Sequence, residues 1–528
     1  MRKPEPVAPP RLPVALRAAV STAIPVLVGN ATGALGAGLI ATLGAFTARF
    51  GVGRPYLSRA AHLALVAGAL ALAVTAGAWA ADVAWAGVLT VSAIAVLAVW
   101  LCSALKVGPP GAYVFVVACA AGIGVSASRL SPWQIGALVL AGGMLAWAVQ
   151  MLGALTSFRR PERVAVQTAA DRVADYLGAV GGPDEDAARR RAAHALHQAW
   201  TALADQQPVA SGSRELHRLR AANHAVHVLF ARAEPDTADL AHALGRLEAD
   251  PDAVAHRDPD RHPPPQAPAR HLLRAALRTG SQTRRVMVRV AIGVPLAGFA
   301  AVGLGVDRAY WAMAAAVLIL HQGAPLWHAL RRGAERLLGT WIGLALAAAI
   351  IVIHPQGWLL AAVLALLNFA IEMLVARTYL LASVFITATA LTIGTASHPL
   401  APGQVGHLLL TRGIDTFIGC AIGLAVYLAL ARRQETHRLA DALAATRAAL
   451  ACAEPFVAAG DTASLAARTA RRDLQISALD MLDVLDAAQA GPRDQRADAT
   501  RLGPEVLAVE RASSQTIAAL WAVESRRG

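Results

Sequence analysis

Residues 335–353 decide the fold class, and they read ERLLGTWIGLALAAAIIVI. Beyond Glu335 and Arg336 the stretch carries no charged side chain. Its length is close to the ~20 apolar residues that a helix needs to cross a bilayer. Similar stretches recur on both sides of it along the chain. The sequence therefore predicts an all-helical protein that crosses a membrane many times.

The apolar stretches fall into two clusters of six predicted spans. The second and eighth spans are the shortest. The first cluster holds 14–32, 34–49, 60–81, 85–105, 111–128 and 132–156, and the second holds 287–305, 309–322, 335–353, 357–375, 379–396 and 406–431.

The composition agrees with a membrane protein. Of the 528 residues, 56% are hydrophobic and only 16% are charged, and the mean hydropathy is +0.47. A soluble domain of this length rarely has such a balance. The net charge of +13 comes almost entirely from arginine, and no basic–aromatic recognition motif accompanies it. We therefore expect the positive charge to lie in cytoplasmic loops and domains, and we expect no nucleic-acid partner.

The orientation follows from the positive-inside rule. With a cytoplasmic N-terminus, the inside loops hold many basic residues and the outside loops hold few. Five tryptophans fall at the predicted outer ends, as in an aromatic belt. We expect an inner-membrane protein with twelve spans and both termini in the cytoplasm. The basic residues of the inside loops are Arg49, Arg54, Arg59, Lys106, Arg331, Arg332, Arg336 and Arg377, and the tryptophans are Trp79, Trp85, Trp133, Trp311 and Trp358.

Polar, helix-forming segments follow each cluster. Residues 172–179 read RVADYLGA after the first cluster, and residues 438–445 read RLADALAA after the second. Arg17 with Pro25 also resembles Arg289 with Pro295. We interpret the chain as two repeats, each of six transmembrane helices followed by a helical cytoplasmic domain. The predicted domains are 1–156, 157–286, 287–432 and 433–528.

The sequence lacks the common motifs for enzymatic chemistry. Neither Lys3 nor Lys106 lies in a P-loop context, and no HExxH or GxSxG occurs. The four cysteines form no CxxC pair, which favours buried apolar residues over a metal site. We therefore predict no enzyme, no cofactor and no metal site.

Charged residues inside predicted spans are the strongest functional signal, because a charge in the bilayer is costly. Arg412 and Asp415 lie one helical turn apart in the twelfth span, where they share a face and can pair. Arg336 lies near the start of the ninth span. Either arginine can also serve simply to anchor a helix end at the lipid headgroups.

A threonine and a GxxxG motif follow each arginine. Thr340 with Gly339 and Gly343 follows Arg336. Thr416 with Gly419 and Gly423 follows Arg412 in the same way. GxxxG spacing favours close helix packing, so these four glycines are predicted packing positions.

These motifs resemble the FUSC family of fusaric-acid-resistance and aromatic-acid-exporter-like proteins, which are related to the aluminium-activated malate transporters. The resemblance lies in the second half of the chain, in Tyr310-Trp311-Ala312 and the two arginine motifs. It implies export or permeation of organic anions, often aromatic carboxylates, and a homodimer.

The candidate substrate path combines these residues. Excess positive charge at or inside the membrane suits an anionic substrate, because arginine binds carboxylates through two hydrogen bonds. His321 is a weaker candidate for proton coupling. The alternative is a non-transporting membrane scaffold whose cytoplasmic helices bind a partner. The candidate path or gating residues are Arg17, Arg289, Arg336, Thr340, Arg412, Asp415 and Thr416.

Overall fold

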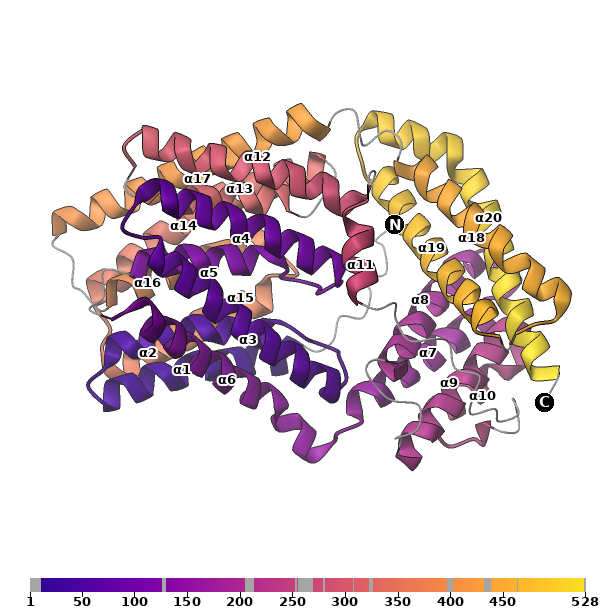
Figure 1. The fold of residues 1–528 in the computed structure, drawn as a ribbon. Coiled ribbons are helices and arrows are strands. Elements are labelled where there is room, and N and C mark those ends of the chain that lie inside the picture. The colour runs from indigo at the N-terminus through magenta and orange to yellow at the C-terminus, as the bar shows by residue number, and fades with distance from the viewer. Residues whose placement is uncertain are drawn as a thin grey trace. The chain divides into compact units, whose positions relative to one another are not determined.

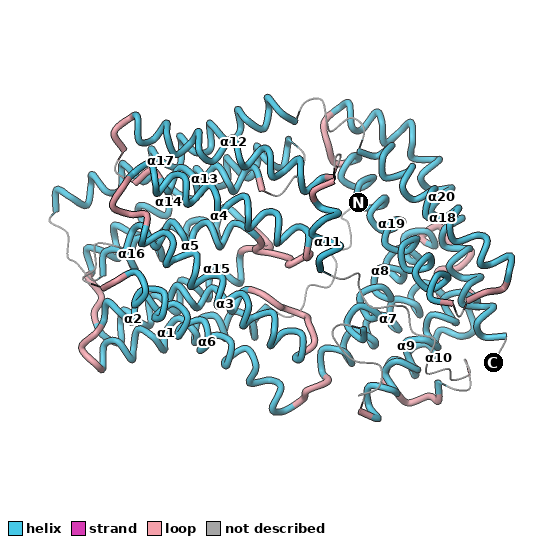
Figure 2. The backbone as a smooth tube through the Cα atoms, viewed as in Figure 1, coloured by secondary structure: helices cyan, strands magenta, loops and turns pink. Residues whose placement is uncertain are grey.

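The computed structural model contains only helices, turns and loops in the part of the chain that it describes (Figures 1 and 2). The predicted domain boundary at 432–433 lies outside that part. The described residues are 11–125, 130–204, 213–251, 254, 269–278, 281–306, 308–321, 326–396, 402–431, 438–462 and 464–526.

The chain divides into two compact units. Unit 1 comprises residues 1–53, 59–153 and 267–431, and unit 2 comprises residues 54–58, 154–266 and 432–528. Each unit thus combines stretches from both halves of the sequence.

Unit 1 holds the apolar helices. Its helices are α1 (Arg11–Ala31), α2 (Leu35–Ala41), η1 (Thr42–Arg49), α3 (Tyr56–Trp79), α4 (Ala84–Ala104), α5 (Ala112–Val125), α6 (Pro132–Thr156), α11 (Ala269–Ala276), α12 (Gln282–Gly303), α13 (Tyr310–Leu320), α14 (Leu326–Ile353), α15 (Gly357–Leu374), α16 (Tyr379–Ala396) and α17 (Pro402–Ala431).

Ten described helices are long and apolar enough to cross a membrane. Nine of them coincide with predicted spans. The other three predicted spans, 34–49, 111–128 and 309–322, form shorter helices instead. The span at 34–49 divides into α2 and the 3-10 helix η1, so it cannot cross a bilayer as one regular helix. The tenth long helix is α18 (Arg438–Ala459), which the sequence analysis placed in the polar tail.

The short helices lie in the interior of unit 1. Every residue of α13 except Trp311 is buried, and α5 contributes Val114, Val116 and Cys119 to the same apolar core. A helix surrounded by protein does not need to match the bilayer thickness. Their burial therefore explains why these apolar segments can be short.

The two clusters of predicted spans pack against each other reciprocally. α1, the first helix of the chain, packs against α15, and α12, the first helix of the second cluster, packs against α4. The first helix of each cluster thus packs against the fourth predicted span of the other cluster.

Unit 2 is a set of amphipathic helices with their own apolar cores. A buried ion pair joins Arg189 Nη2 to Glu510 Oε2 at 2.7 Å. His227 packs against Trp521, with ring centroids 4.7 Å apart. Its helices are α7 (Arg160–Leu177), α8 (Glu185–Ala204), α9 (Arg214–Arg232), η3 (Pro235–Thr237), α10 (Ala238–Gly245), α18 (Arg438–Ala459), α19 (Leu465–Gln489) and α20 (Arg493–Arg526).

Candidate functional site

Arg412 and Asp415 lie on the inward face of α17. Arg412 is only 3% exposed and Asp415 is fully buried. Leu410 and Phe417, on the other side of the helix, are largely exposed. Arg412 therefore does not reach outward to lipid headgroups, and the anchoring interpretation does not fit its position.

The guanidinium of Arg412 stacks on an indole ring. Its central carbon lies 3.2 Å from the centroid of the Trp311 ring at the start of α13. Gly419 permits this approach, because a Cβ atom there would lie 2.0 Å from the backbone oxygen of Ala312. Gly423 lies against Ala316 one turn further along. These two glycines bring α17 and α13 into backbone contact.

Arg336 is buried on α14 and is likewise 3% exposed. Tyr113 on α5, Tyr379 on α16 and Cys420 on α17 lie near its guanidinium. Its Nε and Nη1 atoms are buried and form no hydrogen bond with the part of the protein that the structure describes. A buried charged donor in this state is costly unless another group accepts from it.

The two buried arginines belong to one cluster. Arg336, Tyr113 and Tyr310 all lie within electrostatic range of Arg412. We call this set the arginine–aromatic cluster. It draws its members from α5, α13, α14, α16 and α17, and comprises Tyr113, Tyr310, Trp311, Arg336, Tyr379, Arg412 and Asp415.

The polar side chains beside the arginines are also buried. Thr416 donates its hydroxyl to the backbone oxygen of Arg412 at 2.9 Å, which is a helix-internal bond. Thr340 is fully buried, and its hydroxyl has no hydrogen-bond partner among the described residues. Thr340 therefore offers a neutral donor one turn from Arg336.

Gly339 and Gly343 bring α14 against α16. A Cβ atom at Gly339 would lie 2.2 Å from the hydroxyl of Ser383, and one at Gly343 would lie 2.6 Å from the backbone oxygen of Val384. Ser383 and Thr387 are buried on the facing side of α16. The close approach therefore lines this helix contact with hydroxyl groups near Arg336.

The remaining predicted residues lie in different surroundings. Arg289 is buried on α12, with its guanidinium 4.9 Å from the ring of Tyr427. Arg17 is partly buried and donates to the backbone oxygen of Pro13 at 3.0 Å within α1. His321 lies at the end of α13, stacked on Tyr113 with ring centroids 6.1 Å apart. His321 thus contacts the cluster through Tyr113, whereas α1 and α12 contribute none of its members.

Tyr113 and Tyr379 are members of the site that were not predicted from the sequence. Both are single tyrosines near the first residue of an apolar helix, and no spacing rule connects them with Arg336. The structure pairs Glu372 Oε1 with Arg49 Nε at 3.0 Å, across 323 residues of sequence.

Part of this site lies in a segment that is similar to a known family. Residues 296–426 match the profile of a family described as fusaric acid resistance protein-like, and these residues include both buried arginines. The chain is also 28% identical over 473 residues to YvaC, an uncharacterized membrane protein of Bacillus subtilis strain 168, covering 81% of this chain and 74% of the relative. No solved structure matches. The predicted resemblance is confirmed, and the chain is a multi-pass membrane protein.

Proposed function

This is a membrane protein whose residues 296–426 match the profile of the fusaric acid resistance protein-like family, and from that premise we propose that it transports small organic anions. The proposed substrates are aromatic carboxylates, and the proposed activity is export or passive permeation rather than enzymatic catalysis. The observation that carries the proposal is the pair of buried arginines in the arginine–aromatic cluster.

The charge of the cluster favours an anion. It holds two guanidinium groups and one carboxylate, that of Asp415, so it carries an excess of positive charge in apolar surroundings. A buried excess charge is costly, and binding a carboxylate lowers that cost. The buried Nε and Nη1 atoms of Arg336 and the Nε and Nη2 atoms of Arg412 lack acceptors among the described residues. These atoms are suitable donors for carboxylate oxygens.

The rings of the cluster favour an aromatic substituent. The ring of Trp311 lies against the Arg412 guanidinium. Tyr113, Tyr310 and Tyr379 lie within electrostatic range of the arginines. An aromatic acid can therefore place its carboxylate at the arginines and its ring among these side chains.

Reciprocal packing supports a path between the two halves of unit 1. The exchange of α1 and α12 between the clusters is the arrangement expected of two related repeats with the same orientation. Transport paths in such proteins commonly lie near the interface between repeats. The arginine–aromatic cluster fits this expectation. Of its five helices, α5 belongs to the first set of six predicted spans and the other four belong to the second set.

Flux through proteoliposomes tests the proposal. Labelled benzoate is followed with wild-type protein and with Arg336→Gln, while Arg331→Gln serves as the matched control. Arg331 lies on the same helix, but it is exposed and pairs with Glu335 at 2.8 Å. We expect flux to fall at least about tenfold in Arg336→Gln, from the loss of a charge-assisted hydrogen bond, and to be unchanged in Arg331→Gln.

Absence of benzoate flux in the folded wild-type protein, with a panel of other organic anions also negative, would contradict the proposal. That result would favour the scaffold alternative.

A further inference from the structure

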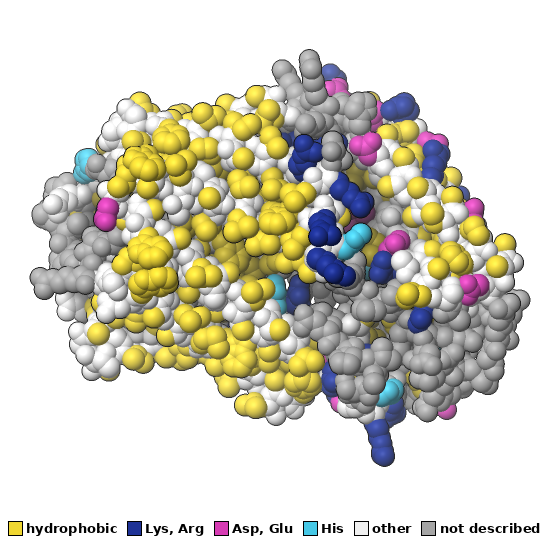
Figure 3. Space-filling model, in the orientation of Figure 1, with side chains coloured by type: hydrophobic (Ala, Val, Ile, Leu, Met, Phe, Trp, Pro, Cys, Tyr) yellow, Lys and Arg dark blue, Asp and Glu magenta, His cyan; other side chains and the backbone are white. Residues whose placement is uncertain are grey.

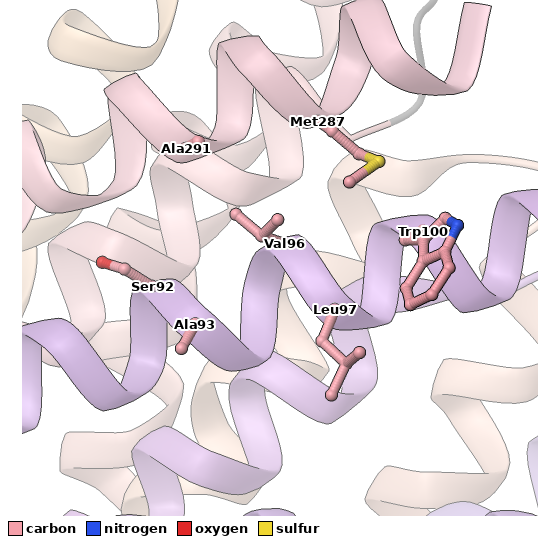
Figure 4. Close-up of a pocket in the computed structure, with 7 residues that line it drawn as sticks. All are labelled: Ser92, Ala93, Val96, Leu97, Trp100, Met287 and Ala291. Carbon is pink, nitrogen blue, oxygen red and sulfur yellow. The ribbon is translucent and has the colours of Figure 1, made fainter. Parts of the chain in front are cut away.

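A groove lies on the outer surface of unit 1 between α4 and α12 (Figure 4). Its volume is about 440 Å³, which falls within the range of sites that hold a small molecule or part of a lipid. The groove is almost entirely apolar. It is lined by Ser92, Ala93, Val96, Leu97, Trp100, Met287 and Ala291.

The polar groups of the groove are already engaged within the protein. The Ser92 hydroxyl donates to the backbone oxygen of Val88 at 2.7 Å. The Trp100 indole N–H donates to the backbone oxygen of Leu273 at 3.1 Å. The lining therefore presents hydrocarbon to an occupant, which suits an acyl chain.

The bond from Trp100 fixes a basic helix beside one end of the groove. Leu273 belongs to α11, and α11 packs against both α4 and α12. Trp100 and Met287 lie near the last turns of α4 and the first turns of α12, so this end of the groove faces one membrane surface. Figure 3 shows Lys and Arg side chains gathered beside the yellow surface over α4 and α12.

Arg270 and Arg274 on this helix, with Arg278 two residues beyond its end at Ala276, form one exposed stripe. Arg270, Arg274 and Arg278 follow each other at intervals of four residues, and all three are exposed. Leu272 and Leu273, between them, are partly buried. Side chains four residues apart lie on the same helical face. Three guanidinium groups therefore lie at the same membrane surface as the open end of an apolar groove.

We propose that the groove between α4 and α12, with the Arg270–Arg274–Arg278 stripe, binds one anionic phospholipid. One acyl chain lies along Val96, Leu97 and Ala291, and the phosphate lies at the arginine stripe. Basic residues beside apolar clefts between membrane helices recognise anionic headgroups by this chemistry. The occupant is a lipid of the leaflet that faces the end of α4 at Ala104 and the start of α12 at Gln282.

Native mass spectrometry of the full-length protein tests this site. The purified protein is titrated with phosphatidylglycerol or with phosphatidylcholine of the same acyl chains. We expect one phosphatidylglycerol to bind at concentrations at least about tenfold lower than phosphatidylcholine. We expect Arg270→Gln/Arg274→Gln/Arg278→Gln to abolish this preference. The control Arg214→Gln/Arg232→Gln/Arg493→Gln removes the same charge from exposed positions of unit 2. We expect this control to retain the preference for phosphatidylglycerol.

A second variant tests the apolar part of the site. Ala93→Trp/Ala291→Trp fills the groove from both helices and leaves the arginines in place. We expect it to lose the high-affinity lipid while its melting temperature in lipid-free detergent stays near that of the wild type.

Two outcomes would overturn the proposal. The first is equal binding of the two lipids by wild-type protein, which would indicate ordinary lipid contact. The second is efficient disulfide cross-linking of a Val96→Cys variant between two chains in membranes that contain phosphatidylglycerol, because a second copy of the chain would then cover the groove.

Discussion

The guanidinium carbon of Arg412 lies 3.2 Å from the centre of the Trp311 indole ring. This stack joins α17 to the start of α13 in the interior of unit 1. A cation over a ring face is held by the negative potential of the ring, and the attraction is stronger where water is excluded. The contact also holds the guanidinium against the ring and so limits the positions that Arg412 can adopt. Trp311 therefore positions the donors proposed to bind the substrate.

Substitutions at Trp311 change how Arg412 is positioned and leave its charge in place, so they test the two contributions to benzoate flux separately. We expect Trp311→Phe to keep much of the benzoate flux, since a phenyl ring still stacks on the cation, though more weakly. We expect Trp311→Ala to lower flux at least about tenfold, because it removes ~2 kcal/mol of cation–π attraction from a desolvated site. Equal flux in the two variants would show that the ring face does not position Arg412.

Gly419 tests the contact between α17 and α13. A methyl group there would lie 2.0 Å from the backbone oxygen of Ala312, whereas one at Gly394 would meet nothing within 4 Å. We expect Gly419→Ala to destabilise the protein by about 3 kcal/mol or more through overpacking. We expect the control Gly394→Ala to match or slightly exceed wild-type stability. Melting temperatures in detergent check both, and equal values would contradict the packing seen here.

The ion pair between Arg49 and Glu372 stabilises the contact between η1 and α15. Arg49 Nε lies 3.0 Å from Glu372 Oε1, and Arg49 Nη2 donates to Asn368 Oδ1 at 3.0 Å. Both side chains of the pair are mostly buried. Arg49→Leu removes the cation beside a desolvated carboxylate and is expected to cost about 3–5 kcal/mol.

A double-mutant cycle checks this pair. Adding Glu372→Leu to Arg49→Leu removes the carboxylate as well, so we expect it to restore part of the lost stability. Additive losses from the two single substitutions would indicate that the residues do not interact.

His227 gives unit 2 a pH-dependent stability. Burial lowers the pKa of His227 from 6.5 to about 3, and the nearby His224 and Arg471 act in the same direction. Above pH 6.5 the imidazole is neutral in both the folded and the unfolded state, so it causes no loss of folding stability there. Below pH 6.5 the imidazole is protonated in the unfolded state but stays neutral in the folded state. The free energy of unfolding therefore falls as the pH drops toward 3.

The expected loss at pH 5 is about 2 kcal/mol relative to pH 7.5. Thermal unfolding of the full chain at the two pH values measures it. His227→Phe keeps a ring against Trp521 but cannot titrate, so its melting temperature is expected to depend less on pH than that of the wild type. The same dependence in both proteins would assign the effect to other groups.

Most spans could be predicted because length and apolarity are local properties of the sequence. Nine predicted spans coincide with long apolar helices. The break of residues 34–49 into α2 and η1 was not predicted, because it depends on the neighbouring helix α6. Gly44 lies against the backbone of Val139, and Gly142 lies against that of Ala41. Such close contacts between distant residues leave no periodic pattern in the sequence.

The site could be predicted only one helix at a time. Buried charge in an apolar span marked Arg336 and Arg412 separately, and helical spacing related Arg412 to Asp415 on the same helix. Spacing carries no information on which helices meet in space. The convergence of α14 and α17 with the start of α13, and the contribution of Tyr113 from the other half of the chain, therefore required the structure.

The most direct test of the central claim is flux of labelled benzoate through proteoliposomes that contain wild-type protein, Arg412→Ala or Arg412→Lys. We predict wild-type flux that is lost in Arg412→Ala and largely lost in Arg412→Lys, because an ammonium group cannot reproduce the planar, two-bond contact with a carboxylate. A pH gradient in the same assay separates proton-coupled transport from a channel. Wild-type flux that continues unchanged in a folded Arg412→Ala protein would contradict transport through the arginine–aromatic cluster.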